Sequence, residues 1–421
     1  MKDIVAIILA GGRGERLFPL TKERSKPAVY FGGIYRIIDL TLSNCINSEI
    51  FRIMVFPQYK AQSLVEHIDY GWNIFNRYLG HFLRIVHPQM RVNAEWYKGT
   101  ADSVRQNLYL IEHESTSHFL ILSGDHIYKM NYDYFKNFHT ESNSDISISA
   151  IEVDLCEATK FGVLEIDANN QIIGFEEKPE HPKSIPGKPD KALVSMGIYI
   201  FKKEALVHYL KTIQGDDFGK DIIPEAIKNC KVSAFDYTNE NKIADYIYKH
   251  FPDGTREKYL ETNVHDSGYW RDVGDLDAYW NANMDLTGVN PAFNLYSVLW
   301  PIRTNQRQYP PVKTIFNNES EGRVGGMYDS IVSPGTVISG GRVFNSVVSY
   351  NVRVNSWAEI KESVILPNVE IRRHCKIQRA IVDKDNIIPS GTIIGYDSDE
   401  DRKRFTVSPG GIVVVEKGHF R

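Results

Sequence analysis

Short apolar runs alternate with helix-like stretches over the first two thirds of the chain. The seven apolar residues at 4–10 are typical of a strand buried on both faces, and 52–56 and 118–122 indicate two more strands. Residues 61–67 favour a helix after the second of these runs. Because the alternation continues to about residue 285, we expect an α/β unit with a mostly parallel sheet and helices on both of its faces.

A different pattern begins further along the chain. Aliphatic residues recur with a period of 17, at spacings of six, six and five. The positions are Ile331, Val337, Val343, Val348, Val354, Ile360, Ile365, Ile371, Ile377, Val382, Ile388 and Ile394. A coil with three short faces, each contributing one inward aliphatic residue, stacks into a parallel β-helix. We therefore predict an α/β domain over 1–288, a Pro-bearing linker over 289–313 and a β-helix domain over 314–421.

Composition narrows the function classes. The 421 residues are 42% hydrophobic and 24% charged, as in ordinary globular proteins, and the net charge of −4 gives no reason to expect a nucleic-acid partner. No apolar run has the length of a membrane span, and the first residues do not form a signal peptide, so we expect a cytoplasmic protein without membrane contact. The four cysteines lack CxxC spacing, which favours buried free thiols. They are Cys45, Cys156, Cys230 and Cys375.

A glycine-rich loop directly follows the first buried strand. Its glycines and cations are Gly11, Gly12, Arg13, Gly14, Arg16 and Lys26. Residues without Cβ let backbone N–H groups approach an anion, so this loop is a candidate phosphate site, with a plain turn as the alternative. It is neither a Walker A loop, since GK[ST] is missing, nor a dinucleotide GxGxxG, because Arg16 replaces the third glycine. The three cations favour a triphosphate.

Further candidates follow the other apolar runs, since ligands in such sheets bind beyond the carboxyl ends of strands. Gln58 follows the second run, and Asp125 follows the run at 118–122. Asp125 and the distant Asp272 are candidate ligands of Mg²⁺, which takes carboxylate and phosphate oxygens, although an aspartate in a turn is also an ordinary turn residue. Lys178 precedes a proline at a strand end, where it either binds a phosphate monoester or is simply solvated.

Longer strings carry a family resemblance. GGRGERL…KPAVYFGG resembles the signature of sugar-nucleotide pyrophosphorylases, and FGGIYRIIDLTLSNCINS looks like that of the bacterial ADP-glucose pyrophosphorylase family. The strings WYKGTAD, SGDHIYKM, DFGKDIIP, YWRDVG and WPIRT extend the resemblance across nearly all of the chain.

The resemblance implies a fold and an activity. The fold is a Rossmann-like nucleotidyltransferase domain followed by a left-handed parallel β-helix, whose hand the sequence pattern alone does not derive. The activity is Mg²⁺-dependent transfer of adenylyl from ATP to glucose 1-phosphate, which gives ADP-glucose and pyrophosphate for glycogen synthesis without a covalent intermediate. The family is typically a homotetramer with small allosteric metabolites bound between the domains.

The resemblance also implies residue roles. The loop Gly11, Gly12, Arg13 and Gly14, with Arg16 and Lys26, would hold the triphosphate, and Gln58, Gly99 and Thr100 would hold the base. Asp125 and Asp272 would bind the metal ion, and Lys178 the incoming sugar phosphate. The glucose pocket would be formed by Tyr97, Gly162, Glu177, Lys178, Ser195, Tyr199, Asp217, Phe218 and Trp270. Arg16, Lys26, Asp125 and Lys178 are the expected catalytic residues, and Arg24 and Arg36 the expected effector residues.

Three alternatives remain open at this point. The phosphate loop and metal aspartates do not distinguish among nucleotide sugars, so another NDP-sugar pyrophosphorylase is one alternative. A catalytically silent regulatory subunit is the second, although Asp125, Lys178 and Asp272 are all present. The third is an acyltransferase, since β-helices also occur in that class, but His374 has no partner pattern in the repeat region.

Overall fold

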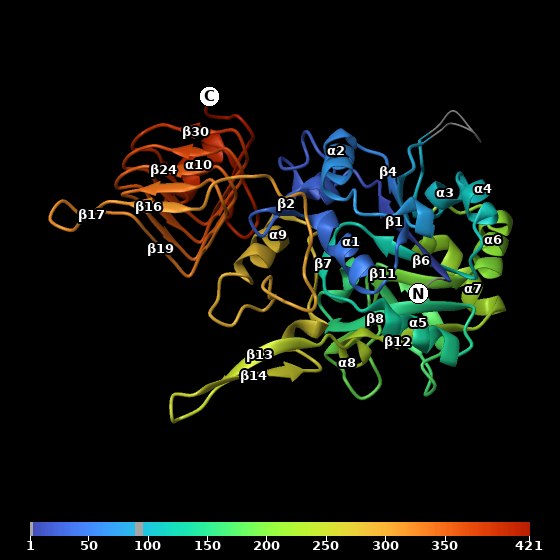
Figure 1. The fold of residues 1–421 in the computed structure, drawn as a ribbon. Coiled ribbons are helices and arrows are strands. Elements are labelled where there is room, and N and C mark those ends of the chain that lie inside the picture. The colour runs from blue at the N-terminus through green and yellow to red at the C-terminus, as the bar shows by residue number, and fades with distance from the viewer. Residues whose placement is uncertain (1–2, 89–95) are drawn as a thin grey trace.

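Two units of different architecture lie side by side in the structure, a computed structural model that describes residues 3–88 and 96–421 (Figure 1). An α/β unit forms the first part of the chain, and stacked short strands form the last part. The chain passes from one unit to the other through a stretch after α9 (Leu276–Met284) that contains no helix or strand before β16 (Lys313–Ile315).

A nine-stranded sheet forms the centre of the α/β unit, with the path β10-β9-β11-β6-β1-β4-β5 and with β8 joining β11 to β12. Its strands are β1 (Ile4–Ala10), β4 (Arg52–Pro57), β5 (Phe82–Ile85), β6 (His118–Ser123), β8 (Ile146–Asp154), β9 (Gly162–Ile166), β10 (Ile172–Glu177), β11 (Lys191–Lys202) and β12 (Val232–Asp236). The three strands predicted from the apolar runs are confirmed as β1, β4 and β6. In β1, Val5 and Ile7 join the hydrophobic cluster on one face, and Ile4, Ala6 and Ile8 join that on the other.

The sheet is mixed, whereas the sequence led us to expect a mostly parallel one. β1 is parallel to both β4 and β6, but β11 is antiparallel to β6, β8 and β9, and β9 is antiparallel to β10. A parallel pair requires a long crossover, while only residues 167–171 join β9 to β10. The short connection therefore dictates a hairpin in this part of the sheet.

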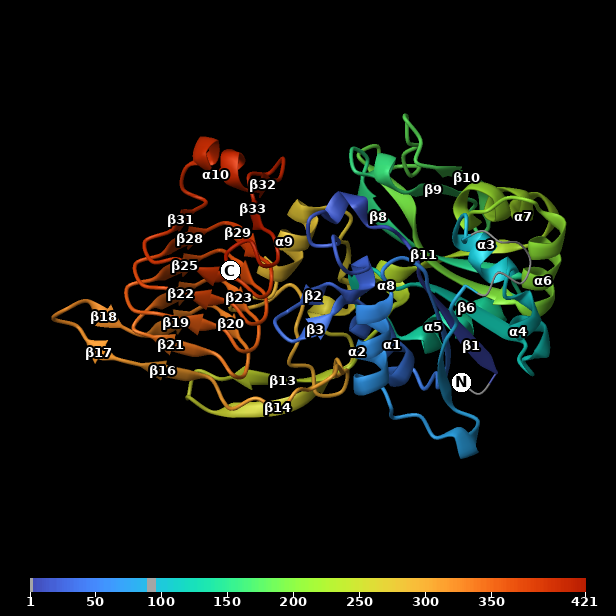
Figure 2. The ribbon, with the colours of Figure 1, turned by 90° about the horizontal axis from the view of Figure 1, so that it is seen from above.

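Helices cover both faces of the sheet, as predicted (Figures 1 and 2). They are α1 (Ile37–Asn47), α2 (Gln62–Gly71), α3 (Thr100–Arg105), α4 (Leu108–His113), α5 (Tyr132–Glu141), α6 (Lys203–Thr212), α7 (Ile223–Asn229) and α8 (Tyr237–Glu240), with α9 beside the second unit. Short 3₁₀ turns are η1 (Glu15–Leu17), η2 (Lys26–Ala28), η3 (Arg77–Leu79), η4 (Ala158–Lys160) and η6 (His265–Gly268), and η5 (Phe218–Ile222) is a π-helical turn.

Three small antiparallel pairs lie outside the main sheet. They are β2 (Tyr30–Phe31) with β3 (Tyr35–Arg36), β7 (His126–Tyr128) with β15 (Trp270–Asp272), and β13 (Asp245–His250) with β14 (Arg256–Glu261). The pair β13 and β14 projects from the body as a ribbon (Figure 1). The pair β7 and β15 joins segments far apart in the sequence, directly after the sheet strand β6.

The second unit is a β-helix built from three parallel sheets, which Figure 2 shows as stacked coils. The first sheet is β16, β21 (Val337–Ser339), β24 (Arg353–Val354), β27 (Glu370–Ile371) and β30 (Ile387–Ile388). The second is β19 (Gly326–Tyr328), β22 (Arg342–Phe344), β25 (Glu359–Lys361), β28 (Lys376–Gln378) and β31 (Ile393–Ile394). The third is β20 (Ile331–Val332), β23 (Val347–Val348), β26 (Val364–Ile365), β29 (Ala380–Val382), β33 (Val413–Val415) and an antiparallel β32 (Thr406–Val407). The hairpin β17 (Asn317–Asn318) with β18 (Arg323–Val324) and helix α10 (Ser398–Arg404) decorate it.

The predicted ladder is confirmed in three of the four coils. From Val343 to Ile394 every position that the repeat selected is fully buried, and the strand register aligns them from coil to coil. In the first coil two positions are wrong, because the inward residues are Val332 and Ile338 rather than Ile331 and Val337. The corner through Gly340 and Gly341 has one residue fewer than the later corners, which shifts the preceding positions by one.

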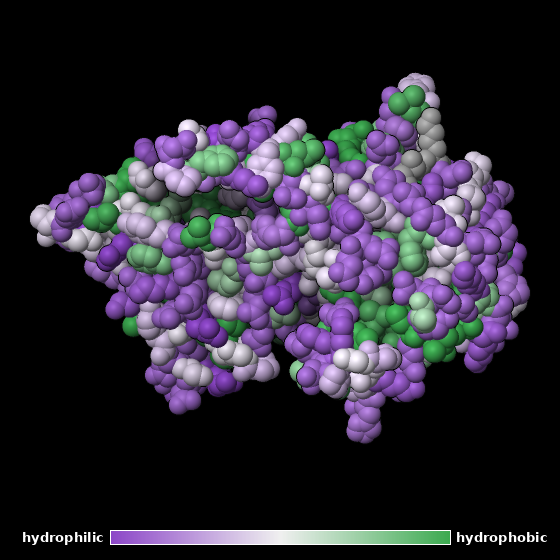
Figure 3. Space-filling view, turned by 90° about the horizontal axis from the view of Figure 1, so that it is seen from below, coloured by the Kyte–Doolittle hydropathy of each residue, from purple (hydrophilic) through white to green (hydrophobic). Residues whose placement is uncertain are grey.

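Two other expectations concern the burial of the cysteines and the absence of a membrane-spanning segment. All four cysteines are free, and Cys45 and Cys375 are buried as predicted. Cys156 is exposed because it lies in the turn after β8, and Cys230, directly after α7, is only half-buried. Within the described ranges no helix is long and apolar enough to cross a membrane. Figure 3 shows a largely hydrophilic face on which hydrophobic residues form separate groups.

Candidate active site

The carboxyl ends of three neighbouring strands meet at one edge of the sheet. β1 lies between β4 and β6 and is parallel to both, so the segments that follow them are adjacent. The backbone N–H of Gly124 donates to the carbonyl of Leu9 at 3.0 Å. A Cβ at Gly11 would lie 3.2 Å from the Gln58 side chain. The sheet thus places the glycine loop, Gln58 and the turn of Asp125 beside one another.

The glycine loop turns through a left-handed residue. Gly14 has φ +63°, a conformation that favours glycine, and the Thr21 hydroxyl donates to its carbonyl at 2.9 Å. A Cβ at Gly14 would lie 3.2 Å from Cβ of Lys26. Gly12 has open space around its Cβ position among the described residues, and the exposed Arg13 pairs with Glu15 at 3.6 Å. The loop therefore has an open backbone position at Gly12 and an exposed cation, Arg13, beside it, and Lys26 packs against Gly14.

Lys26, Asp125 and Asp272 meet at one point. Nζ of Lys26 lies 2.9 Å from Oδ2 of Asp125 and 3.2 Å from Oδ1 of Asp272. The antiparallel pair of β7 and β15 produces this contact, because its register puts Asp272 opposite His126, the residue after Asp125. Two carboxylates that are distant in sequence thus share one ammonium group.

Charge determines the ionisation of this cluster. Burial alone lowers the pKa of Lys26, but the carboxylates of Asp125 and Asp272 outweigh it and hold that pKa above its ordinary value. Burial alone raises the pKa of Asp125, and the Lys26 ammonium, with His126 and the Ser123 hydroxyl, outweighs it and holds that pKa well below its ordinary value. Lys26 and Asp125 are consequently charged at neutral pH.

The donor set fits a magnesium ion that shares its coordination with a substrate. Mg²⁺ is commonly held by one or two carboxylates together with substrate phosphates, and Asp125 and Asp272 supply two carboxylates beside a glycine loop. No group of three or more His, Cys, Asp and Glu side chains placed for a metal ion is found in residues 3–88 and 96–421.

Arg16 and two buried ring nitrogens complete this end of the site. A Cβ at Gly274 would lie 2.9 Å from Oδ2 of Asp272 and 3.2 Å from Nη2 of Arg16, so both side chains flank this glycine. Over the part of the chain that the structure describes, Nδ1 of His126 and Nε1 of Trp270 are buried without a hydrogen-bond partner, and their rings are 5.4 Å apart. Nε2 of His126 lies 3.6 Å from Asp125 and 3.8 Å from Asp272, and the sequence analysis did not select this residue. Its place directly after Asp125 is the signal that could have indicated it.

The candidate base-binding residues form a second group. Nε2 of Gln58 donates to the carbonyl of Tyr97 at 2.9 Å. Gly99 precedes α3 and packs on the backbone of Asp216, where a Cβ would lie 2.4 Å from the carbonyl oxygen. The Thr100 hydroxyl donates to Asp217 at 3.0 Å and accepts from the N–H of Phe218 at 3.0 Å. The turns at 97–100 and 216–218 are therefore packed together and joined by hydrogen bonds.

The candidate sugar residues Gly162, Glu177 and Lys178 lie on the β9 and β10 hairpin. A Cβ at Gly162 would lie 2.8 Å from Oε2 of Glu177, and one at Gly219 would lie 2.7 Å from the same oxygen. Lys178 has φ +52°, and its half-exposed side chain places Nζ 3.3 Å from Oε1 of Glu177. Glycine at these two positions leaves room for the carboxylate, which is suited to accept hydrogen bonds from sugar hydroxyls.

A bulge in β11 positions two further candidates. The register with β8 shifts between Ser195 and Tyr199, and Gly197 within it has φ +68°. The Ser195 hydroxyl accepts from the N–H of Gly197 at 3.2 Å, and the ring of Tyr199 lies 5.9 Å from that of Phe218. Burial, which the Ser195 hydroxyl opposes, raises the pKa of Tyr199, so its phenol is neutral.

The two expected effector arginines are buried in the structure. Nη2 of Arg24 lies 2.9 Å and 2.7 Å from the two carboxylate oxygens of Asp383, an ion pair that joins the two units. Nη1 of Arg36 donates to the carbonyl of Ala28 at 3.0 Å and to the Ser63 hydroxyl at 2.7 Å. Their effector role stays a prediction, and their observed contacts are structural.

Both units of the chain are similar to known protein families. Residues 5–288 match the family described as "Nucleotidyl transferase", and residues 310–415 match "GlmU-like, C-terminal hexapeptide". The "Glucose-1-phosphate adenylyltransferase" of Koribacter versatilis (strain Ellin345) is 46% identical over 100% of this chain and 96% of the relative. The chain belongs to the glucose-1-phosphate adenylyltransferase family.

Other members of the glucose-1-phosphate adenylyltransferase family agree at the same level. The Rhodopirellula baltica protein of that name is 47% identical over 100% of this chain and 91% of its own. The Shewanella oneidensis protein is 46% identical over 99% of this chain and 95% of its own. The matches cover both units, so the resemblance to ADP-glucose pyrophosphorylases is confirmed along the whole chain, and the second unit is a hexapeptide-type β-helix.

Proposed function

We propose that this protein transfers the adenylyl group of ATP to α-D-glucose 1-phosphate, with ADP-glucose and pyrophosphate as products. The observation that carries the proposal is the cluster of Lys26, Asp125 and Asp272 beside the glycine loop. The full-length similarity to glucose-1-phosphate adenylyltransferases supports the choice of base and sugar over another nucleotide sugar. The intact cluster argues against a catalytically silent subunit.

The transfer requires that the two substrates be aligned and that their negative charges be neutralised. The sugar phosphate itself attacks the α-phosphorus in line, so the protein needs no nucleophile of its own. The loop of Gly11, Gly12 and Gly14 binds phosphate oxygens through backbone N–H groups. Arg13 and Arg16 stabilise the negative charge of the leaving pyrophosphate. Lys178 directs its charge at the phosphate of glucose 1-phosphate.

A second set of residues orients the two substrates. Gln58, Gly99 and Thr100 hold the adenine end, and the linked turns at 97–100 and 216–218 connect that end to the sugar pocket. Glu177, Ser195 and Tyr199 bind glucose hydroxyls, while Tyr97, Gly162, Asp217, Phe218 and Trp270 line the same pocket. The buried ring N–H of Trp270 has no hydrogen-bond partner among the described residues and is proposed to donate to the substrate.

Asp125 and Asp272 would hold Mg²⁺. The ion, when bound, supplies positive charge at the phosphates that separate during transfer. The role of Lys26 is to keep the two carboxylates together, since both lie against its ammonium group.

The proposal extends to organisation. We assign 1–288 to the catalytic domain, 289–313 to the linker and 314–421 to the β-helix domain. The flat parallel sheets of the β-helix provide surfaces for a symmetric homotetramer, and small metabolites regulate the enzyme near the contact of the two domains.

Pyrophosphate release with Mg²⁺ and glucose 1-phosphate tests the function. ATP, UTP, GTP and dTTP are compared in parallel, and selective release with ATP is expected. Asp125→Asn is the control for contaminating activity and should lose about 10²–10³-fold in rate. Release with another nucleotide would replace ADP-glucose by a different product, and release with none would favour the silent subunit.

A further inference from the structure

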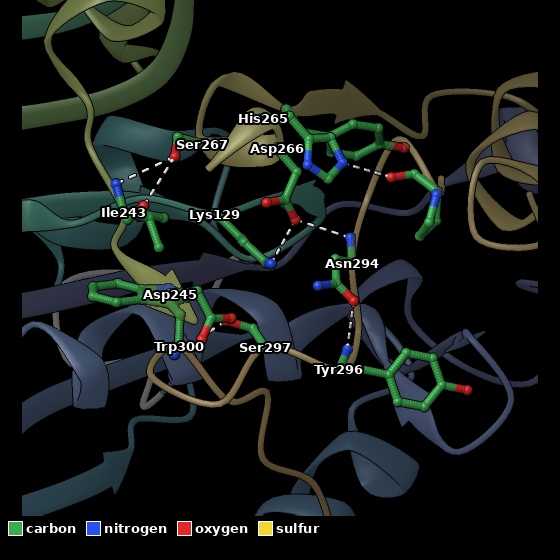
Figure 4. A network of polar contacts seen from close by, with 12 residues as sticks. Lys129, Ile243, Asp245, His265, Asp266, Ser267, Asn294, Tyr296, Ser297 and Trp300 are labelled. Atoms are coloured by element: carbon green, nitrogen blue, oxygen red, sulfur yellow. Dashed lines mark hydrogen bonds and ion pairs between the residues drawn. The ribbon is translucent and has the colours of Figure 1, made fainter. Parts of the chain in front are cut away.

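A second charge pair lies close to the active site and is fully buried (Figure 4). Nζ of Lys129 lies 2.5 Å from Oδ2 of Asp266, and both side chains are at most 1% exposed. The same carboxylate oxygen accepts from the backbone N–H of Asn294 at 2.9 Å. The ring of Phe293 lies 5.1 Å from the Lys129 ammonium. None of these residues belongs to the proposed substrate site.

The pair closes the far end of the two strands that carry the metal aspartates. Lys129 directly follows β7, and Asp266 lies in η6, just before β15. In the register of this pair Trp270 lies opposite Tyr128 and Asp272 opposite His126. The buried charges thus lie at one end of the short ladder, and Asp125 and Asp272 at the other.

The backbone at the charged end is also clamped. The Tyr237 hydroxyl lies 2.7 Å from the carbonyl of Lys129 and 2.8 Å from that of Tyr269. The Asn241 amide donates to the carbonyl of Lys129 at 3.0 Å and to that of Ser267 at 2.5 Å. Both strands are therefore tied at this end to the segment that contains α8.

We propose that Lys129 and Asp266 are positioning residues that fix the register of β7 against β15 and so hold Asp125 and Asp272 together. A ladder of only three residue pairs resists slippage weakly, and a slip by one residue would move Asp272 by about 3.3 Å along the strand. Such a slip would also separate two buried charges, which is strongly unfavourable because each would lose its partner without gaining water. The observed register is the one that pairs them.

The same pair connects the linker to the metal aspartates. Asn294 donates to Asp266 (Figure 4). A few residues later the N–H groups of Val298 and Leu299 donate to Asp245, at 3.1 Å and 3.2 Å from Oδ1. Nε1 of Trp300 then donates to Asn44 in α1 at 3.0 Å. A displacement of the linker therefore acts on the end of the β7 and β15 ladder. This inference rests on the proposed function only for its catalytic consequence.

The test compares Lys129→Met, Asp266→Asn and the double variant K129M/D266N in the full chain. Each single variant leaves one buried charge unpaired and lowers the thermal unfolding midpoint, whereas the double variant removes both charges and recovers most of that stability. Asn at 266 keeps an acceptor for Asn294. The binding of Mn²⁺ in the presence of ATP, followed by electron paramagnetic resonance, should nevertheless be about tenfold weaker in the double variant, and kcat about 10–100-fold lower.

Matched controls separate positioning from stability. Arg52 and Glu114 form another largely buried ion pair at the start of β4, the end of that strand remote from Pro57. R52M/E114Q should leave Mn²⁺ binding unchanged. A double variant K129M/D266N that binds Mn²⁺ and turns over like the wild type would overturn the proposal, because the pair would then be only structural.

Hydrogen exchange on the unaltered chain gives a second test if the variants do not fold. The amides of 126–128, 270–272 and Asn294 should open together as one unit. Independent exchange of Asn294 would refute the link to the linker. Mn²⁺ binding and hydrogen exchange are measured without turnover. A wild-type chain that releases no pyrophosphate would therefore refute the proposed function, while the positioning role of Lys129 and Asp266 would still be decided by these two measurements.

Discussion

At the residue scale, a single exposed cation is expected to select the sugar phosphate. Lys178 follows β10 with φ +52° and pairs only loosely with Glu177, at 3.3 Å. A hydrogen bond between charged groups contributes about 1.5–3 kcal/mol, so Lys178→Ala should raise KM for glucose 1-phosphate by about 10–100-fold. KM for ATP should change by about threefold or less.

Steady-state kinetics with each substrate varied in turn measures this split. Lys183→Ala is the control, since Lys183 is an exposed lysine in the segment after the same hairpin and pairs with Glu165 at 2.7 Å. Equal increases in both KM values would show that Lys178 does not act on the sugar phosphate alone.

A buried histidine sets part of the pH dependence of stability. Burial, with smaller effects from His118 and Lys202, lowers the pKa of His139 to about 3, and its Nδ1 lies 2.8 Å from the Ser147 hydroxyl. The unfolded chain binds this proton near pH 6.5. Between about pH 6.5 and 3 the unfolded state therefore carries the extra proton, and the free energy of unfolding falls by about 1.4 kcal/mol per pH unit as pH falls.

Urea unfolding at pH 7 and pH 5 tests this contribution. His139→Gln removes the titrating group. Between pH 7 and pH 5 the free energy of unfolding of this variant should fall by about 2 kcal/mol less than that of the wild type. If both proteins lose the same stability, His139 does not bind its proton differently in the folded and unfolded states.

At the scale of elements, the β-helix is stabilised by ladders of buried aliphatic residues at equivalent positions in successive coils. Ile338 is fully buried and aligns with Val354 in the next coil, while the neighbouring Val337 is only half-buried. Ile338→Ala should cost about 2–5 kcal/mol, and Val337→Ala about 1 kcal/mol or less. Thermal unfolding of both variants measures the difference, and the reverse order would restore the register predicted from the spacing.

The first coil shows why periodicity located the ladder without fixing every position. From Val343 onward the spacing of six, six and five repeats without change, and every selected residue is buried. The corner at Gly340 and Gly341 is one residue shorter, and a Cβ at Gly341 would lie 2.7 Å from the carbonyl of Asn355. The shorter corner accompanies the close packing of two coils. The spacing of aliphatic residues along the chain does not record such contacts between coils.

At the scale of the whole molecule, the two domains are joined by buried polar contacts. Besides the Arg24 and Asp383 pair, the hydroxyls of Tyr30 and Tyr350 lie 2.9 Å apart, and Nε1 of Trp280 donates to the carbonyl of Glu362 at 2.8 Å. These contacts join residues that follow the glycine loop, and residues of α9, to the β-helix, and the two units share one hydrophobic cluster.

Asp383→Ala tests the strength of this junction. It leaves the Arg24 guanidinium buried without its partner, which should cost about 3–5 kcal/mol in urea unfolding and speed proteolysis within 289–313. Glu416→Ala is the control, because Glu416 pairs with the exposed Lys22 at 2.6 Å across the same junction and should cost about 1 kcal/mol or less. Equal costs would mean that burial adds nothing to the Arg24 pair.

What the sequence determined by itself is local. The apolar run of β1, the glycine loop after it and the strand end before Lys178 depend on residues close together in the chain, and all are found where the pattern placed them. Motif resemblance added the family and the identity of candidate residues, because substrate chemistry restricts the residue types at such positions.

Only the tertiary structure decided how these parts combine. Lys26 meets both Asp125 and Asp272 because β7 pairs with β15 in one register. Lys26 and Asp272 are 246 residues apart in the chain. The tertiary structure also buried Arg24, an effector residue expected from the family resemblance, against a carboxylate of the second unit. Local patterns follow from the preferences of neighbouring residues, whereas partners of buried charges are chosen by the packing of distant segments, and no spacing along the chain records that choice.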